Sequence, residues 1–233
     1  LNQALNQAGV FFDLIAMDAC LMGMLEVAYE VKNYTDIMVA SEDNVPGEGF
    51  HYQQFLENLV AFPYMDNLTL SRAMIDSYIS KYPFGTTLTL SSVNSLQLSS
   101  LTNEVNNLAK TIMQDNRTSK EVYRNIITRD TICFSDVDFI DLGDFALKLI
   151  GHPQILSSQV KSSAQQVLNQ VSNAVLYNRS QGNNSYWTLN NTQGLSIYLP
   201  IYTKYVEKYQ NLQFAKNTNW DELIRHLTVG GNR

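Results

Sequence analysis

The chain has 233 residues, and its 16 lysines and arginines against 22 aspartates and glutamates give a formal net charge of −6. This acidic balance, with no basic cluster interleaved with aromatic residues, argues against a nucleic-acid-binding protein. No apolar run reaches the length that crosses a membrane, and two widely separated cysteines do not make a disulfide framework. The length suits one large domain or two small ones with a sizeable hydrophobic core.

The first part of the chain alternates strand-like and helix-like patterns. Three segments are short apolar runs or alternate apolar with polar residues, as strands do: 11–17, 37–41 and 86–92. Three others have the helical spacing of apolar residues: 21–32, 52–61 and 69–81. Strands that alternate with helices predict an α/β fold with a mostly parallel sheet flanked by helices.

The second part of the chain is predicted to be mainly helical. Helical spacing covers four segments: 95–115, 120–128, 142–150 and 157–177. Asp141 precedes the third of them in the position of a helix N-cap. Two late strands are expected, as a hairpin or as neighbours in a sheet: 186–190 and 195–199. We therefore expect 1–92 to form the core that carries Cys20, and 93–233 to form an additional, largely helical region whose late strands pack on that core.

Cys20 stands where the first predicted strand ends and the following helix begins. Open α/β sheets place their active sites at the carboxyl ends of strands, and the partial positive charge of a helix N-terminus favours a thiolate. This cysteine is therefore placed for chemistry. The alternative is a buried, unreactive thiol, which is the commoner state of a free cysteine and the one we expect for Cys133.

Residues 12–23, which read FDLIAMDACLMG, resemble the nucleophile region of the clostripain family, the C11 group of caspase-like cysteine peptidases. The resemblance continues through EVAYE at 26–30 and over later segments: 37–43, 46–50, 194–200 and 219–223. It is strong at the start of the chain and patchy beyond it. It implies a caspase-like fold and a cysteine endopeptidase in which Cys20 attacks the peptide bond.

The resemblance also implies a histidine base, which in this family ends an apolar block in His-Gly and precedes the cysteine in the chain. The histidines here, His51, His152 and His226, all follow Cys20, and none of them is followed by glycine. His51 shares the loop after the second strand, but we expect it to be a rim or helix-start residue. The resemblance therefore implies a heavy chain, whose partner is a light chain of the same precursor that carries the catalytic histidine.

Asp18 and Glu48 are the candidate substrate-binding residues. Asp18 lies two positions before Cys20, so an extended strand places both side chains on one side, where a carboxylate would pair with a substrate cation. The resemblance implies that this acid lines a pocket for the arginine or lysine before the cut; the alternative is a structural hydrogen bond at the strand end. Glu48, between two glycines, is the candidate second acid. Glu42 or Asp43 could fill that role instead, and all three could be solvated loop acids.

The expected thiol chemistry requires no cofactor. The same acids could hold calcium, an ion that prefers oxygen ligands and on which some clostripain-like enzymes depend, so a metal site stays open. Many tyrosines and asparagines with few lysines are compatible with a secreted or periplasmic bacterial protein. The alternative to an endopeptidase that cuts after arginine or lysine is a non-catalytic caspase-like scaffold that binds a partner and retains Cys20 as a vestige.

Overall fold

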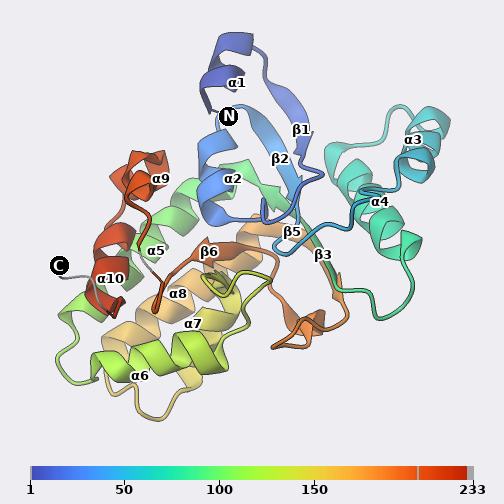
Figure 1. Ribbon diagram of the computed structural model, residues 1–233. Coiled ribbons are helices and arrows are strands. Elements are labelled where there is room, and N and C mark those ends of the chain that lie inside the picture. The colour runs from blue at the N-terminus through green and yellow to red at the C-terminus, as the bar shows by residue number, and fades with distance from the viewer. Residues whose placement is uncertain (1, 204, 230–233) are drawn as a thin grey trace.

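The computed structural model describes residues 2–203 and 205–229, and Figure 1 shows their course. A central sheet has the strand order β1-β2-β3-β5. Its strands are β1 (Phe12–Ala16), β2 (Thr35–Ala40), β3 (Leu88–Asn94) and β5 (Val175–Gln181). A small antiparallel sheet pairs two further strands, β4 (Phe139–Asp141) and β6 (Ser196–Tyr198).

Helices cover both faces of the central sheet (Figure 1). One face carries two of them, α3 (Tyr52–Ala61) and α4 (Asn67–Lys81). The other face carries a larger group: α2 (Leu25–Val31), α5 (Leu98–Gln114), α7 (Leu142–Gly151), α8 (Ser158–Ala174) and α10 (Trp220–Leu227). Alternation along β2 explains this division, because Ile37 and Val39 join the first core. Met38 and Ala40 point the other way and join the second core.

Short elements complete the chain. They are α1 (Asn2–Ala8), η1 (Ser95–Gln97), α6 (Lys120–Asn125), the π-helical η2 (Ile126–Asp130), η3 (Leu189–Asn191), η4 (Glu207–Asn211) and α9 (Gln213–Lys216). Within 2–203 and 205–229, none of the helices has the length and apolar character needed to cross a bilayer.

The central sheet combines parallel and antiparallel neighbours. β1 runs parallel to β2, with Leu14 opposite Ile37 and Ala16 opposite Val39, and α2 lies in the crossover between them. β3 pairs antiparallel with both β2 and β5. The α/β class with flanking helices is confirmed. Cys20 follows the end of the parallel pair, β1 and β2. The sequence predicts a mostly parallel sheet, whereas two of the three strand pairs in this sheet are antiparallel.

The region that follows β1 differs from its predicted structure. The helix predicted at 21–32 begins only at Leu25. Hydrogen bonds to the end of β2 hold the preceding loop in an irregular course. Cys20 therefore lies in a loop at the carboxyl end of β1, as expected, but it is not at a helix N-terminus, and the helix dipole cannot be invoked to activate its thiol.

Two later segments also differ from their predictions. The helix predicted at 157–177 ends at Ala174, and its last residues begin β5, where the chain turns back along β3. Residues 186–190 form a turn and the start of η3 instead of a strand, and β6 pairs with β4. The N-cap prediction for Asp141 is confirmed, because its carboxylate accepts a hydrogen bond from the Asp144 N–H at 2.8 Å.

Glu26 is a buried carboxyl group on α2 that should make stability depend on pH. Its Oε1 accepts hydrogen bonds from the Tyr198 N–H at 3.0 Å and the Tyr209 hydroxyl at 2.8 Å. Burial raises the pKa of Glu26 from 4.5 to about 7, although these hydrogen bonds act against the rise. The folded chain therefore holds a proton that the unfolded chain releases, so the free energy of unfolding falls as the pH rises between 4.5 and about 7.

We expect Glu26→Gln to flatten this dependence. The amide keeps an acceptor oxygen for Tyr198 and Tyr209 but cannot ionise. The stability of the variant relative to the wild type should rise by up to about 1.4 kcal/mol per pH unit across this window and level off above it. Urea unfolding at pH 5 and pH 8 measures the difference, and equal differences at both pH values would show that Glu26 is already ionised in the folded chain.

Candidate active site

The loop that carries Cys20 is attached to the end of β2 by backbone hydrogen bonds. The N–H of Met17 donates to the Val39 carbonyl at 2.9 Å, which extends the parallel pairing by one residue beyond β1. Two further bonds tie the loop down: the Leu21 N–H to the Asp43 carbonyl at 3.2 Å, and the Gly23 N–H to the Ser41 carbonyl at 2.7 Å. These bonds fix the position of Cys20, which is exposed to solvent.

Leu21 holds the turn that follows Cys20. Among the described residues other than glycine, only Leu21 has a positive φ, of 58°. This left-handed conformation costs an L-residue roughly 1–2 kcal/mol, so other contacts must stabilise it. The Leu21 side chain packs on a cluster formed by Ile132, Phe134 and Leu189. The packing anchors one side of the loop while Cys20 stays exposed on the other.

The thiol of Cys20 contacts the loop that follows β2. The Val45 N–H donates to Sγ at 3.3 Å, and Sγ lies 3.7 Å from the Val45 carbonyl oxygen. None of the three histidines, all within the described part of the chain, hydrogen-bonds to this thiol. His51 is the N-cap residue of α3, His152 lies 3.9 Å from Asp130, and His226 is on α10.

Asp18 is exposed and is fixed to the loop after β2. Its Oδ2 accepts hydrogen bonds from the Phe50 N–H at 3.1 Å and the Tyr52 hydroxyl at 2.8 Å. The bond from Tyr52 to Asp18 raises the pKa of the Tyr52 hydroxyl, because ionised Asp18 disfavours a phenolate beside it. Oδ1 has no hydrogen-bond partner within the described residues, so it remains available to a cation. The loop 43–52 thus contacts both Asp18 and Cys20.

α4 and the residue after it hold this loop in place. The Lys81 ammonium donates to three successive carbonyl oxygens: Glu48 at 2.6 Å, Gly49 at 3.0 Å and Phe50 at 3.1 Å. The Tyr82 hydroxyl donates to the Gly49 carbonyl at 2.7 Å. Sequence reasoning missed Lys81, Tyr82, Tyr52 and Val45, since their contacts join residues that are distant along the chain and no local pattern marks them.

The remaining candidate acids divide into exposed and buried groups. Glu48 is exposed on the loop, whereas Glu42 is 1% exposed and Asp43 is fully buried. Asp43 Oδ1 accepts hydrogen bonds from the Asn44 N–H at 2.8 Å and the Ser135 N–H at 2.9 Å. Burial, followed by the charge of Asp141, raises the pKa of Glu42 well above its usual value. A substrate cation in solvent reaches Glu48 more readily than these two acids, which leaves Glu48 as the better candidate.

No three side chains of His, Cys, Asp or Glu gather into a potential metal site in the part of the chain that the structure describes. The thiol of Cys133 is buried, and burial raises its pKa above the ordinary value for cysteine. Cys20 is therefore the more accessible of the two cysteines.

Gly49 is required where the loop passes over Asp18. Its φ is +61°, and a Cβ atom built on it would overlap the Asp18 carboxylate. Gly49→Ala should therefore lower the free energy of unfolding by at least about 1 kcal/mol and push the Asp18 carboxylate from its place. Gly47→Ala is the matched control, because a Cβ there meets nothing within 4 Å. Thermal unfolding of both variants measures the effect, and equal melting temperatures would contradict this packing.

The chain matches the model of the clostripain family over residues 1–227. No curated protein matches it closely enough to count as a relative. Several solved structures share its fold, among them the following three. A clostripain from Bacteroides thetaiotaomicron in complex with the peptide inhibitor BTN-VLTK-AOMK is 18% identical, has a TM-score of 0.70, and is covered over 92% of its length by 93% of this chain.

The other two structures are longer. An inactive zymogen C11 protease from Parabacteroides distasonis is 20% identical with a TM-score of 0.68, and 94% of this chain covers 61% of it. A secreted C11 cysteine protease from Bacteroides thetaiotaomicron, in complex with an irreversible peptide inhibitor, is 21% identical with a TM-score of 0.68, and 95% of this chain covers 62% of it. The match over nearly the whole sequence shows that the chain belongs to the clostripain family of cysteine peptidases.

Proposed function

We propose that this chain is the heavy chain of an endopeptidase that cleaves after arginine or lysine, with Cys20 as nucleophile. The observation that carries this proposal is the exposed Asp18 carboxylate, two residues before Cys20 and held by Phe50 and Tyr52 with Oδ1 left free. A carboxylate fixed beside the nucleophile selects a cationic side chain for the residue before the cut. The inhibitor of the Bacteroides thetaiotaomicron clostripain, whose VLTK sequence ends in lysine, supports the same preference.

The reaction follows from the chemistry of the thiol. The Cys20 thiolate attacks the peptide carbonyl, the amine leaves with a proton, and water hydrolyses the resulting thioester; no cofactor is required. The backbone N–H of Cys20 has no acceptor among the described residues, so it is available to stabilise the oxyanion. A free thiol is only slightly ionised at neutral pH, and no histidine of this chain hydrogen-bonds to Cys20. The base is therefore assigned to a light chain of the same precursor.

The edge of the central sheet is the place where the light chain would bind. β1 is an edge strand, and Phe11 and Phe12 are 59% and 36% exposed there. An exposed apolar edge strand is a template for pairing with another strand. This chain covers 61% of the longer zymogen structure, so that related protein has a further polypeptide segment, which supports the proposal of a second chain here. A strand added to β1 would extend the sheet beside Cys20 and bring a histidine to it.

Replacement of Phe12 by aspartate in the precursor should weaken the association of the two chains, because a charge on the β1 edge opposes burial. Phe84→Asp is the control, since Phe84 is almost fully exposed on the turn before β3.

Denaturing mass spectrometry of the purified native enzyme tests for the second chain. It should reveal a light chain, which ends in lysine or arginine if the enzyme processes itself. A folded, fully active heavy chain without any second fragment would refute the two-chain assignment.

Cleavage-site profiling of the assembled enzyme tests the proposed specificity. A mixture of proteins digested by the enzyme should give new carboxyl termini that are predominantly lysine and arginine. A profile without a basic preference would contradict the role of Asp18 and leave the peptidase assignment intact. A secreted or periplasmic location belongs to the same proposal, and it is supported by the related structure described as a secreted protease.

A further inference from the structure

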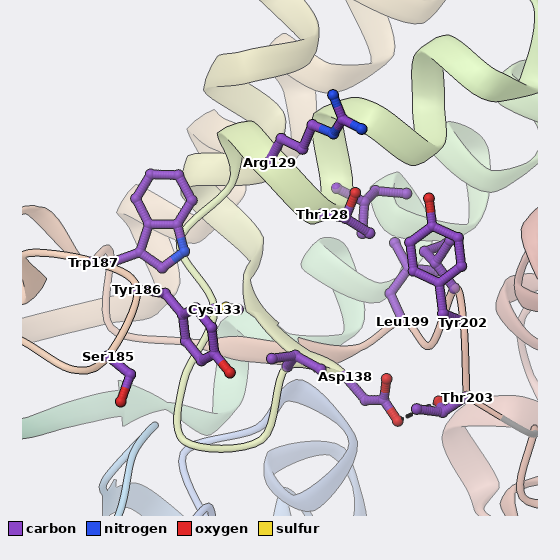
Figure 2. A pocket seen from close by; sticks show the side chains of 13 residues that line it. Thr128, Arg129, Cys133, Asp138, Ser185, Tyr186, Trp187, Leu199, Tyr202 and Thr203 are labelled. Carbon is purple, nitrogen blue, oxygen red and sulfur yellow. Dashed lines mark hydrogen bonds between the residues drawn. The ribbon is translucent and has the colours of Figure 1, made fainter.

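An aromatic cavity of about 730 Å³ lies on the side of the molecule where the turn after β5 approaches β6 and η2. Figure 2 shows Trp187 and Tyr186 on one side of it and Tyr202 on the other, with Arg129 above and Asp138 below. Leu199 and the buried Cys133 also contribute to its lining. Aromatic walls of this kind favour bulky apolar side chains over ions or water.

The turn that presents the aromatic residues is held in a defined conformation. Asn184 Oδ1 accepts hydrogen bonds from the backbone N–H groups of Tyr186 and Trp187, at 2.8 and 2.7 Å. The amide group of Asn184 donates to the Cys133 carbonyl at 2.7 Å. One side chain therefore ties the turn to the neighbouring segment and orients Tyr186 and Trp187 toward the cavity, so the cavity walls are preorganised.

A second cavity, of about 600 Å³, connects this region with the nucleophile loop. The two cavities share Ser185 and Tyr186 in their linings. The second cavity is also lined by Asp43 and Asn44. Asp43 accepts a hydrogen bond from Leu21, and Asn44 precedes Val45, whose backbone contacts the Cys20 thiol. Polar groups form the rest of this lining: Thr87, Ser135, Asn183 and Asn184.

We propose that the aromatic cavity binds a bulky apolar side chain of the polypeptide substrate, several residues away from the scissile bond. This inference rests on the proposed endopeptidase function. The substrate backbone would cross the second cavity, whose amides and hydroxyls can pair with peptide groups, and an apolar residue would enter between Tyr186 and Tyr202. A substrate polypeptide is the ligand that fits this cavity, because the path begins at the loop that holds Cys20, where the enzyme must already bind its substrate.

The two exposed tyrosines allow a test that spares the fold. Tyr186 and Tyr202 are each 62% exposed, so truncation to alanine removes cavity walls and little core packing. The assembled enzyme is assayed with a short amide substrate that has one arginine and with long peptides in which a phenylalanine is moved along both sides of the cut. Tyr186→Ala and Tyr202→Ala should each lower the ratio of kcat/KM for the best long peptide to that for the short one by about tenfold, as loss of an interface anchor does.

Tyr64→Ala is the matched control, because Tyr64 is 99% exposed between α3 and α4 and lines neither cavity. Its ratio should equal that of the wild type. A ratio that does not change in either cavity variant, or no preference for phenylalanine at any position, would overturn the inference.

Binding provides a readout that does not depend on cleavage. Fluorescence anisotropy of the labelled long peptide on Cys20→Ala enzyme should show about tenfold weaker binding when Tyr186 is also replaced. Equal binding of the peptide with and without the Tyr186 substitution would contradict a role of the cavity in substrate binding, even if the enzyme proved inactive. A wild-type enzyme that cleaves no basic substrate at all would contradict the proposed function instead, so the two failures are distinguishable.

Discussion

Replacement of Cys20 by alanine should lower peptidase activity by at least about a thousandfold, because the nucleophile of a covalent mechanism has no substitute in the site. The fold should be retained, since the side chain is exposed and its contacts are with the Val45 backbone. Cleavage of an arginine amide by the assembled enzyme measures the loss, and circular dichroism checks the fold. Full activity in this variant would exclude Cys20 as the nucleophile.

Cys133 provides the matched control for this experiment. It is buried, and its thiol has a raised pKa, so iodoacetamide should modify Cys20 first. Cys133→Ala should keep activity at the arginine amide, although it removes a buried side chain and lowers stability somewhat. Preferential labelling of Cys133, or inactivation by Cys133→Ala with the fold intact, would reverse the assignment of the two cysteines.

Asp18→Asn should reduce kcat/KM for arginine and lysine substrates by well over tenfold. The asparagine keeps the size of the side chain and an oxygen for Phe50 and Tyr52, but it leaves the substrate cation without a counter-charge. Asp18 is exposed in the free chain, and a bound substrate would desolvate the charge pair; loss of one partner of such a desolvated pair costs about 2–5 kcal/mol. The variant should also lose its discrimination against neutral residues before the cut, which a comparison of arginine with leucine substrates measures.

Two further substitutions serve as comparisons for Asp18→Asn. Glu48→Gln should have a smaller effect, since, unlike Asp18, its exposed carboxylate is fixed by no hydrogen bond from the described residues and solvent screens its charge. Asp221→Asn, on α10 at a distance from the site, should leave specificity unchanged (Figure 1). Unchanged kinetics in Asp18→Asn would return Asp18 to a structural role, in which it only anchors the loop that contains Gly49.

The position of Cys20 at a strand end follows from local sequence, because the short apolar run before it and the charged Asp18 that interrupts this run are visible in the order of the side chains. The exposure of Cys20, and of Asp18 two residues earlier, follows from the same strand end. The conformation of the loop does not. Leu21 adopts a positive φ that no sequence rule assigns to leucine, and it does so because the loop hydrogen bonds to residues after β2 and its side chain packs on a distant cluster.

Contacts with residues outside each predicted segment also explain the failed predictions. β5 continues the apolar spacing of α8 into Val175 and Tyr177, and only pairing with β3 makes those residues a strand. Residues 186–190 have aromatic and apolar residues that suit a strand, yet the Asn184 side chain closes them into a turn. The base of the proposed reaction cannot be read from this chain, because none of its three histidines hydrogen-bonds to Cys20. The exposed β1 edge is where we propose that the light chain binds.

The measurement that tests the central claim most directly is the site and selectivity of covalent labelling in the assembled enzyme. A peptidyl acyloxymethyl ketone ending in lysine is compared with one ending in leucine, and the modified residue is identified by peptide mapping. We predict a single adduct on Cys20, formed much faster with the lysine reagent, and a loss of this preference in Asp18→Asn. Labelling of Cys133, or equal rates for the two reagents on Cys20, would contradict the account.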